Sequence, residues 1–364
     1  MGQTNSFTRF INSRKHIRLY AREYAEEHGL NASEVEKDII QAKKYNHISF
    51  GEYAWTGFYD LTQEQKKTVS TLWSRMEFRK KFTDRRYIGM LMNKYIFSKV
   101  FDEFYGRKCV QASDVTEDVL KELAEGTGKV VYKPNCKGMG KGVRVLPVTC
   151  AEDIKDALDH IRNGGNGIIE EYICQDDVLN ELNPSAVSVV RFYSVTSPYG
   201  THLFAPVLTS ALHKDIANGC QDALTAVVDI RTGKVLTDAV DQNKMEEYTV
   251  HPMTGVAFKG LQLNHWDKTL EMLKRAVPLG KKISNIGWDV AITKDGPVLI
   301  EANTIPGFNT AQYAGYGWIT DGYGYQPLFD AVNDVPFEDD GRYERVVMRL
   351  EYKDIRGITD AGQD

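Results

Sequence analysis

The segment covering residues 286–303 constrains the fold more than any other part of the sequence. Two apolar runs flank the turn sequence Lys294-Asp295-Gly296, a pattern that predicts a β-hairpin. With a three-residue loop over residues 294–296, Asp289 lies directly opposite Glu301, and both side chains emerge on the same face. Directly opposed carboxylates repel each other, so they destabilise a hairpin unless something neutralises them.

A divalent cation between the two acids is the interpretation that we favour. Strand alternation places Asn303 on the same face, and oxygen ligands without histidine or cysteine are those that Mg²⁺ or Mn²⁺ prefers. The opposite face is expected to meet a core through four apolar residues: Val290, Ile292, Val298 and Ile300. Two alternatives stay open: a surface hairpin with ordinary polar residues, and a two-residue turn that separates the carboxylates.

A glycine-rich loop between two strand-like runs is the second feature that predicts chemistry. Residues 129–133 end in Lys133, residues 143–148 are again β-rich, and the loop between them holds Gly138, Met139, Gly140 and Gly142. Glycines let backbone amides approach an anion closely. A P-loop would need Ser or Thr after its Gly-Lys pair, and a dinucleotide fingerprint would need a helix after the glycines. The pattern therefore favours a strand–loop–strand lid over phosphate, with a plain glycine hairpin as the alternative.

The N-terminal region, residues 1–108, is predicted to be mainly helical. Two capping boxes, which start at Ser33 and Thr62, predict helix starts, and the second helix is expected to extend to about Phe82. Apolar residues at helical spacing over residues 91–104 indicate a third helix.

The remainder of the chain predicts an α+β fold with helices packed on mostly antiparallel sheets. We expect a smaller lobe over residues 109–185, which contains the glycine loop, and a larger lobe over residues 186–330, which contains the acid hairpin. Helices are expected at about residues 151–161 and 266–276. Residues 331–364 are expected to form a tail packed on the larger lobe.

Composition and charge narrow the set of partners. The net charge is −5 and the densest basic run, residues 79–86, is interpreted as a solvated helix end, so no nucleic-acid partner is expected. The five cysteines stand alone, which argues against a zinc site and is typical of a reducing compartment. The N-terminal segment shows no apolar core of a signal peptide, and no apolar run in the sequence approaches the ~20 residues of a membrane span. We therefore expect a cytoplasmic protein without membrane insertion.

Several segments, in this order along the chain, resemble the ATP-grasp superfamily. More narrowly, they resemble the sugar-transfer-associated ATP-grasp proteins related to α-L-glutamate ligases. The segments that match are Asn93-Lys94, Tyr132-Lys133-Pro134 with the glycine loop, and residues 168–173, 251–255, 286–289 and 301–307. The resemblance covers roughly residues 90–310. It implies an ATP-grasp fold, in which two α+β lobes with mostly antiparallel sheets enclose an ATP cleft.

The resemblance implies that Lys94 and Lys133 contact the phosphates of ATP. The hinge that binds adenine would be formed by Glu170, Glu171, Tyr172 and Ile173. The flexible lid over the nucleotide would contain Gly138, Met139, Gly140 and Gly142. One or two Mg²⁺ ions on the β- and γ-phosphates would be held by Asp289, Glu301 and Asn303. The ribose-binding acid stays open among Asp176, Asp177 and Glu181, with Asp177 as our candidate.

The sequence departs from the ligase pattern next to the metal acids. Ligases such as D-alanine–D-alanine ligase place an arginine two residues before the metal aspartate, and here that residue is Gly287. Arg191, from another strand, is our candidate for the missing charge and, with Lys133, for a catalytic role; the alternative for Arg191 is an ordinary surface strand residue. Asn218 and Asn309 are candidates for substrate contacts, although Asn218 also fits a plain Asn-Gly turn.

The resemblance implies an ATP-dependent ligase that joins a carboxylate to an amine through an acyl-phosphate, with Mg²⁺ as the cofactor. Its substrates would be a small-molecule carboxylate and amine, sugar-linked if the subgroup works in cell-surface polysaccharide synthesis. One alternative keeps the fold but transfers phosphate to a hydroxyl, as a kinase does. The other is a non-catalytic nucleotide-binding partner of a glycan assembly system.

Overall fold

The structure is a computed structural model of the chain, and it describes residues 6–135, 140–198, 200–212, 223–331 and 340–350, with side chains from residue 14 onward. The described residues form two compact units. We call residues 6–80 with 307–331 the helical unit, and residues 81–306 with 340–350 the two-sheet unit. No helix in these ranges is long and apolar enough to cross a bilayer.

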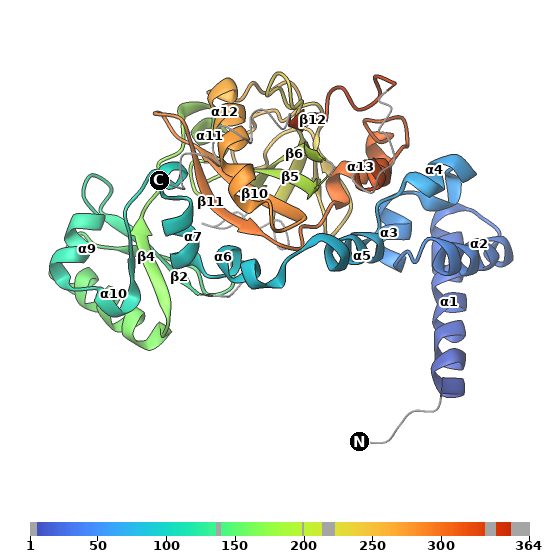
Figure 1. Cartoon of the computed structure of the whole chain (residues 1–364), viewed down its shortest axis with the longest axis horizontal. Helices are drawn as coiled ribbons and strands as arrows, with labels where there is room; N and C mark the ends of the chain where they lie inside the picture. The colour runs from blue at the N-terminus through green and yellow to red at the C-terminus, as the bar shows by residue number, and fades with distance from the viewer. Residues whose placement is uncertain (1–5, 136–139, 199, 213–222, 332–339, 351–364) are drawn as a thin grey trace. The chain divides into compact units, whose positions relative to one another are not determined.

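The helical unit is built from short helices around an apolar core. Its helices are α1 (Ser6–His28), α2 (Ala32–Tyr45), α3 (Phe50–Trp55), α4 (Gln63–Thr68), α5 (Leu72–Phe82) and α13 (Gln326–Ala331), with 3₁₀ turns η1 (Phe58–Asp60), η5 (Asn309–Gln312) and η6 (Ala314–Tyr316) (Figure 1). Val35, Ile39 and Tyr53 are fully buried in its core, which explains the helical spacing of apolar residues in α2.

Two details of the helical unit correct the expected helix starts and lengths. The helix expected to begin at Ser33 is instead capped by Asn31, whose side chain accepts hydrogen bonds from the next backbone amides. The capping box at Thr62 is confirmed. Its helix does not extend to Phe82, because the chain breaks at Ser70, where Gln312 both accepts from the backbone amide and donates to the backbone carbonyl.

The smaller sheet of the two-sheet unit has four antiparallel strands in the order β1-β4-β2-β3. These are β1 (Cys109–Gln111), β2 (Lys129–Pro134), β3 (Arg144–Pro147) and β4 (Gly167–Glu171), with 3₁₀ turn η3 (Ala112–Asp114). Helices α9 (Glu117–Leu123) and α10 (Ala151–Gly164) cover one face, as Figure 1 shows. Val130, Tyr132 and Ile169 point into the core beneath these helices, so the alternate residues of β2 and β4 occupy the opposite face.

The larger sheet has eight antiparallel strands, in the order β11-β10-β5-β6-β7-β8-β9, with β12 also paired to β6. The strands are β5 (Val189–Ser197), β6 (Gly200–Ala211), β7 (Ala223–Val227), β8 (Ala239–Asp241), β9 (Glu246–Tyr248), β10 (Asn285–Ile292), β11 (Pro297–Asn303) and β12 (Val347–Leu350). Helices α11 (Asp177–Leu182) and α12 (Trp266–Ala276) and turn η4 (Val277–Gly280) accompany it. Leu273 of α12 packs with Phe192 and Trp288 in its core.

Three short helices replace the single helix expected over residues 91–104. They are α6 (Ile88–Met92), which follows turn η2 (Arg85–Tyr87), α7 (Lys94–Val100) and α8 (Asp102–Tyr105). The break before α7 occurs because the Asn93 side chain caps it, accepting from two backbone amides. Helices α6 and α8 pack against β11, whereas α7 packs against β1 and β4, so this segment connects the two sheets. The predicted α+β class with antiparallel sheets is confirmed.

Candidate functional site

The acid hairpin is formed by β10 and β11, and Asp289 pairs with Glu301 as predicted. The route to this pairing differs from the prediction. Thr293 and Gly296 exchange two backbone hydrogen bonds of 2.9 and 3.2 Å, so the loop contains two residues, Lys294 and Asp295, rather than three. A two-residue loop with regular pairing would place Glu301 on the face opposite to Asp289.

A β-bulge next to Asp289 restores the pairing of the two acids. Val290 pairs with Leu299 whereas Asp289 pairs with Glu301, so Ile300 is an extra residue in β11. The expectation that Val298 and Ile300 share the core face with Val290 is therefore wrong. Leu299 is fully buried there instead, while Val298 and Ile300 are only half-buried.

Arg191 holds Asp289 from the neighbouring strand. The two residues are paired across β5 and β10, and Arg191 donates from Nε to Oδ1 at 2.6 Å and from Nη2 to Oδ2 at 2.7 Å. Burial alone would lower the pKa of Arg191, but the Asp289 carboxylate raises it above its ordinary value. The guanidinium is therefore charged, and this two-pronged contact is the strongest geometry available to an arginine–carboxylate pair.

Gly287 leaves room for the Pro306 side chain. A Cβ atom at position 287 would lie 2.7 Å from the Pro306 side chain and 3.7 Å from Cδ of Arg191. An arginine at position 287 is thus excluded by packing, while a guanidinium reaches Asp289 from the neighbouring strand.

Glu301 and Asp289 also have partners of their own. Lys94, the first residue of α7, is 8% exposed and places its Nζ 3.8 Å from Oε2 of Glu301. The Asn303 amide donates to Oδ2 of Asp289 at 3.4 Å. The cap at Asn93 fixes the start of α7, and therefore the position from which Lys94 reaches the hairpin.

Lys133 is positioned by Glu170 on the smaller sheet. Val131 pairs with Glu170, and alternation puts Lys133 on the same face of that sheet, where its Nζ lies 2.5 Å from Oε1 of Glu170. Glu170 is 1% exposed. Burial alone would raise its pKa, but Arg107 and Lys133 outweigh burial and lower it to about 2. Glu170 is thus an ionised carboxylate that holds Lys133.

The glycine loop begins and ends as predicted, between antiparallel strands β2 and β3. Gly140 and Gly142 have φ values of +64° and +81°, a backbone region that favours glycine. A Cβ at Gly142 would lie 2.9 Å from Pro134. Gly138 and Met139, two further predicted lid residues, lie outside the described residues.

Comparison with known proteins places this geometry in a family. The model of the sugar-transfer associated ATP-grasp family matches residues 74–320, well over half of the chain. The chain belongs to this family. A search of curated proteins finds no match.

Solved structures similar to this ATP-grasp protein share little sequence with it. N5-carboxyaminoimidazole ribonucleotide synthetase in its ADP complex is 14% identical, with 61% of this chain and 46% of that chain covered and a TM-score of 0.39. The ATP-grasp ligase PsnB with a minimal precursor is 13% identical, with 70% of this chain and 63% of that chain covered and a TM-score of 0.41. D-alanine–D-alanine ligase from Bacillus anthracis is 13% identical, with 82% and 79% covered and a TM-score of 0.41. The chain spans less than two thirds of the length of the first two of these structures.

The remaining hinge candidates of the ATP-grasp protein lie at the end of β4. Glu171 accepts a hydrogen bond of 2.8 Å from the backbone amide of Lys108, and Tyr172 lies under the Lys129 ammonium at 3.6 Å. Ile173 is half-buried. All three residues are thus half-buried and follow directly after the buried Glu170.

The acids after the hinge have different environments. Asp176 is buried, caps α11 and accepts a hydrogen bond of 2.8 Å from Asn264, so both of its carboxylate oxygens make structural hydrogen bonds. Asp177 is exposed and pairs with Lys294 of the hairpin loop at 3.1 Å. Glu181 is exposed.

The structure does not test the two candidate substrate residues, Asn218 and Asn309. Asn218 lies outside the described residues. Asn309 belongs to the helical unit, where it begins η5 and its backbone carbonyl accepts a hydrogen bond from the Trp55 indole. Both remain predictions from the sequence.

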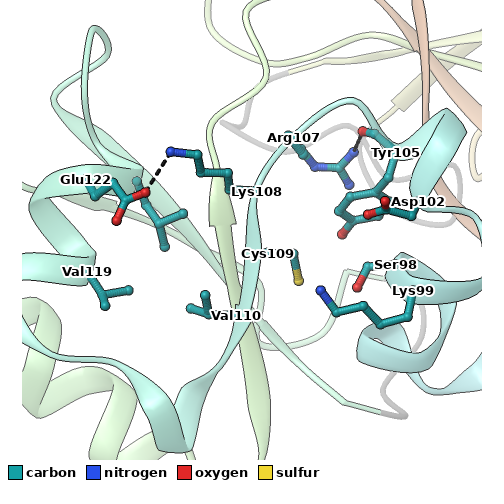
Figure 2. A pocket seen from close by; sticks show the side chains of 11 residues that line it. Ser98, Lys99, Asp102, Tyr105, Arg107, Lys108, Cys109, Val110, Val119 and Glu122 are labelled. Carbon is teal, nitrogen blue, oxygen red and sulfur yellow. Dashed lines mark hydrogen bonds and ion pairs between the residues drawn. The ribbon is translucent and has the colours of Figure 1, made fainter.

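A cavity of about 370 Å³ lies beside Tyr105 and Arg107 (Figure 2). Its walls come from the α7–α8 segment, β1 and α9, and they include Ser98, Lys99, Asp102, Cys109, Val119 and Glu122. Neither the cavity nor the roles of Tyr105 and Arg107 were expected. An arginine after a glycine carries no motif or periodicity that would have marked it.

Proposed function

We propose that this ATP-grasp protein is an ATP- and Mg²⁺-dependent ligase that joins a carboxylate to an amine. One observation supports this most directly: two opposed acids, Asp289 and Glu301, stand within a group of three cationic side chains, Lys94, Lys133 and Arg191. Acids that repel each other suit a divalent cation, and the surrounding cations suit phosphate oxygens.

The donor set fits Mg²⁺. Asp289, Glu301 and Asn303 offer carboxylate and amide oxygens, the ligands that Mg²⁺ prefers. Two carboxylates and an amide leave coordination positions for phosphate oxygens and water, as Mg²⁺ sites on nucleotides require. When bound, the ion would neutralise charge on the β- and γ-phosphates.

The chain's own residues would position the reactants. Lys94 and Lys133 would bind phosphate oxygens, and Arg191, oriented by Asp289, would face charge that develops on the transferred phosphoryl group. Backbone amides near Gly140 and Gly142 would cover the phosphates and exclude water.

The chemistry would follow two balanced steps. A substrate carboxylate oxygen attacks the γ-phosphorus, the bond to the bridging oxygen breaks, and ADP leaves. The amine nitrogen then attacks the acyl-phosphate carbon, phosphate leaves with the C–O electron pair, and the nitrogen loses a proton. The family's description as sugar-transfer associated supports sugar-linked substrates. A place in cell-surface polysaccharide synthesis is a further part of this proposal.

An ADP-release assay tests this function. Purified protein with Mg²⁺ and ATP is incubated with panels of carboxylates and amines, with and without sugars. A ligase releases ADP and phosphate only when both substrates are present, and EDTA abolishes the release. A stable phosphorylated product would instead indicate a kinase acting on a hydroxyl. The complete absence of nucleotide binding would contradict both, and would favour a non-nucleotide role.

Two variants make the assay specific for the acid pair. Glu301→Gln should abolish ADP release while leaving the far-UV circular dichroism spectrum unchanged, because a neutral amide cannot replace the carboxylate on a divalent cation. Glu117→Gln is the matched control, since among the described residues this exposed acid on α9 pairs with Lys121 alone. Equal turnover of both variants would remove the hairpin from the mechanism.

A further inference from the structure

Arg107 makes contacts with two separate parts of the proposed site. Its Nη1 donates to the backbone carbonyls of Tyr105 and Leu299, each at 2.8 Å. Its Nη2 donates to Oε2 of Glu170 at 3.1 Å and to the carbonyl of Ile300 at 3.4 Å. The side chain is 4% exposed, and the neighbouring Glu170 outweighs burial to raise its pKa. A fully charged guanidinium is therefore buried between β4 and β11.

Local structure explains how Arg107 reaches this position. Gly106 ends α8 with φ of +62°, and a Cβ there would lie 2.5 Å from the Val298 side chain. The chain can therefore pass directly against β11 as it enters β1. The guanidinium also lies over the Tyr105 ring, with its Cζ 3.6 Å from the ring centroid, and the Tyr105 hydroxyl bonds Glu170.

The two sets of contacts lead to the two sides of the phosphate site. Through Glu170, Arg107 connects to Lys133, 2.5 Å from the other carboxylate oxygen. Through the carbonyl of Ile300, it holds the bulge residue that immediately precedes Glu301. A guanidinium has a rigid, planar set of donors, so it fixes the separation of the groups that it bonds.

We propose that Arg107 is the positioning residue that sets Lys133 relative to the Asp289–Glu301 pair. This inference rests on the proposed function, because it matters only if phosphates bind between these groups. Arg107 touches neither phosphate nor cation; it acts through Glu170 and the β11 bulge. A lysine would not replace it, since one ammonium cannot hold the carboxylate and the carbonyls in the same plane.

The cavity beside Arg107 provides a direct way to test this role. Figure 2 shows Arg107 and Tyr105 on the wall of the cavity, and Nε of Arg107 is buried without a hydrogen-bond partner among the described residues. Truncation of the side chain to alanine would leave a space next to a cavity of about 370 Å³. Methylguanidinium could enter it and restore the donors without the covalent link.

The experiment compares binding of Mg²⁺·AMP-PNP and of adenosine by calorimetry. Arg107→Ala should weaken AMP-PNP binding roughly tenfold or more, the loss of one charge-assisted contact. Adenosine binding should be weakened less, because Arg107 touches the adenine hinge only through Glu170. Millimolar methylguanidinium should restore AMP-PNP binding, and Arg107→Lys should not. Lys108→Ala is the matched control: this neighbour also lines the cavity, is 59% exposed and pairs with Glu122, so its loss should change nothing.

The outcomes separate failure of this inference from failure of the proposed function. If wild-type protein binds AMP-PNP but Arg107→Ala binds it equally well, Arg107 does not position the phosphate site. The same conclusion follows if Arg107→Ala weakens adenosine binding as much as AMP-PNP binding. If Arg107→Ala fails to fold, Arg107→Gln takes its place. AMP-PNP binding should again be weakened more than adenosine binding, but methylguanidinium should not restore it because the glutamine side chain fills the space. If the wild type binds no nucleotide, the proposed function fails, and this inference fails with it.

Discussion

Asp289 faces a guanidinium and a carboxylate at the same time. Arg191 pairs with it from β5, and Glu301 stands opposite it on β11. Burial raises the pKa of Asp289 and Glu301 adds to this, whereas Arg191 opposes the rise. Each acid therefore has a cationic partner, Arg191 beside Asp289 and Lys94 beside Glu301.

Substitution of Arg191 tests the two-pronged contact. Arg191→Met leaves a carboxylate that is 5% exposed without its partner, so we expect the free energy of unfolding to fall by about 3–5 kcal/mol in urea denaturation. Arg191→Lys keeps the charge but loses the paired geometry, so its free energy of unfolding should fall by less than that of Arg191→Met. Equal losses for the two variants would contradict this expectation and show that the two-pronged geometry, rather than the charge, provides the stability.

Gly287 offers a second test at the scale of one residue. Gly287→Ala introduces a Cβ that would lie 2.7 Å from Pro306, and the strain should lower the free energy of unfolding by about 1–3 kcal/mol. Gly200→Ala, in the same sheet, has no atom within 4 Å of the new Cβ and serves as the control. If both variants have the wild-type melting temperature, Gly287 is not needed for packing.

Functional residues that belong to a sequence pattern could be predicted, whereas those outside any pattern were missed. The pairing of Asp289 with Glu301 was predicted from the hairpin pattern, which is local, although the structure reaches it through a bulge. Arg107 and Tyr105 escaped notice because their partners, Glu170 and the carbonyls of β11, are distant in sequence. No local rule links an arginine to carbonyl groups that a bulge exposes.

At the scale of elements, the start of α2 shows how two plausible caps compete. Asn31 and Ser33 both have side chains suited to an N-cap, and Ser33 also has the acid three residues later that completes a capping box. In the structure Asn31 caps the helix, since it is extended, with φ of −81° and ψ of 115°, and Ser33 is already helical. Sequence reasoning located the helix but not the residue that begins it.

Two substitutions at this helix distinguish the caps. Asn31→Ala should lower the stability of the protein by about 1 kcal/mol, because two backbone amides lose their acceptor. Ser33→Ala should have little effect or raise helix propensity slightly. The melting temperatures of the two variants provide the measurement, and the reverse order would restore the cap predicted from the sequence.

The hairpin of β10 and β11 illustrates a correct result reached by a wrong route. The sequence Lys294-Asp295-Gly296 is compatible with loops of two or three residues, and the three-residue loop was the assumption. The structure has the shorter loop and a bulge at Ile300, whose carbonyl bonds Arg107. The bulge depends on tertiary contacts, which explains why pattern alone could not predict it.

At the scale of the whole molecule, buried charge links the two sheets of the two-sheet unit. Glu170 on β4 holds Lys133 and Arg107, and Arg107 in turn holds the backbone of β11. The fold class, the antiparallel sheets and the family could be predicted from the sequence, because they rest on periodicity and on several motifs in order. The connection through Arg107 could not be predicted, since it is made by the assembled sheets.

This buried network predicts a distinct acid dependence. The pKa of Glu170 is about 2 in the folded protein, below its ordinary value of 4.5, so the unfolded chain binds the proton first as the pH falls. The contribution of Glu170 to stability is therefore complete above about pH 4.5 and is lost towards pH 2, on the order of 3 kcal/mol.

Urea denaturation of wild type and Glu170→Gln at pH 7 and pH 3 measures this contribution. The difference in unfolding free energy between the two proteins should be largest at pH 7. It should shrink at pH 3, because Glu170 is then protonated in the unfolded chain and contributes less to stability. Other carboxylates titrate equally in both proteins, so the difference isolates Glu170. A difference that stays constant with pH would contradict the depressed pKa.

The extra residue in β11 has a consequence for how related genes are recognised. Because the bulge compensates for the short loop, the number of residues between Asp289 and Glu301 is not fixed by the geometry that they share. A hairpin with the same loop and no bulge would bring the same two acids together with one residue fewer between them. A search pattern with rigid spacing would overlook such proteins, whereas one that allows a gap before the glutamate would recover them.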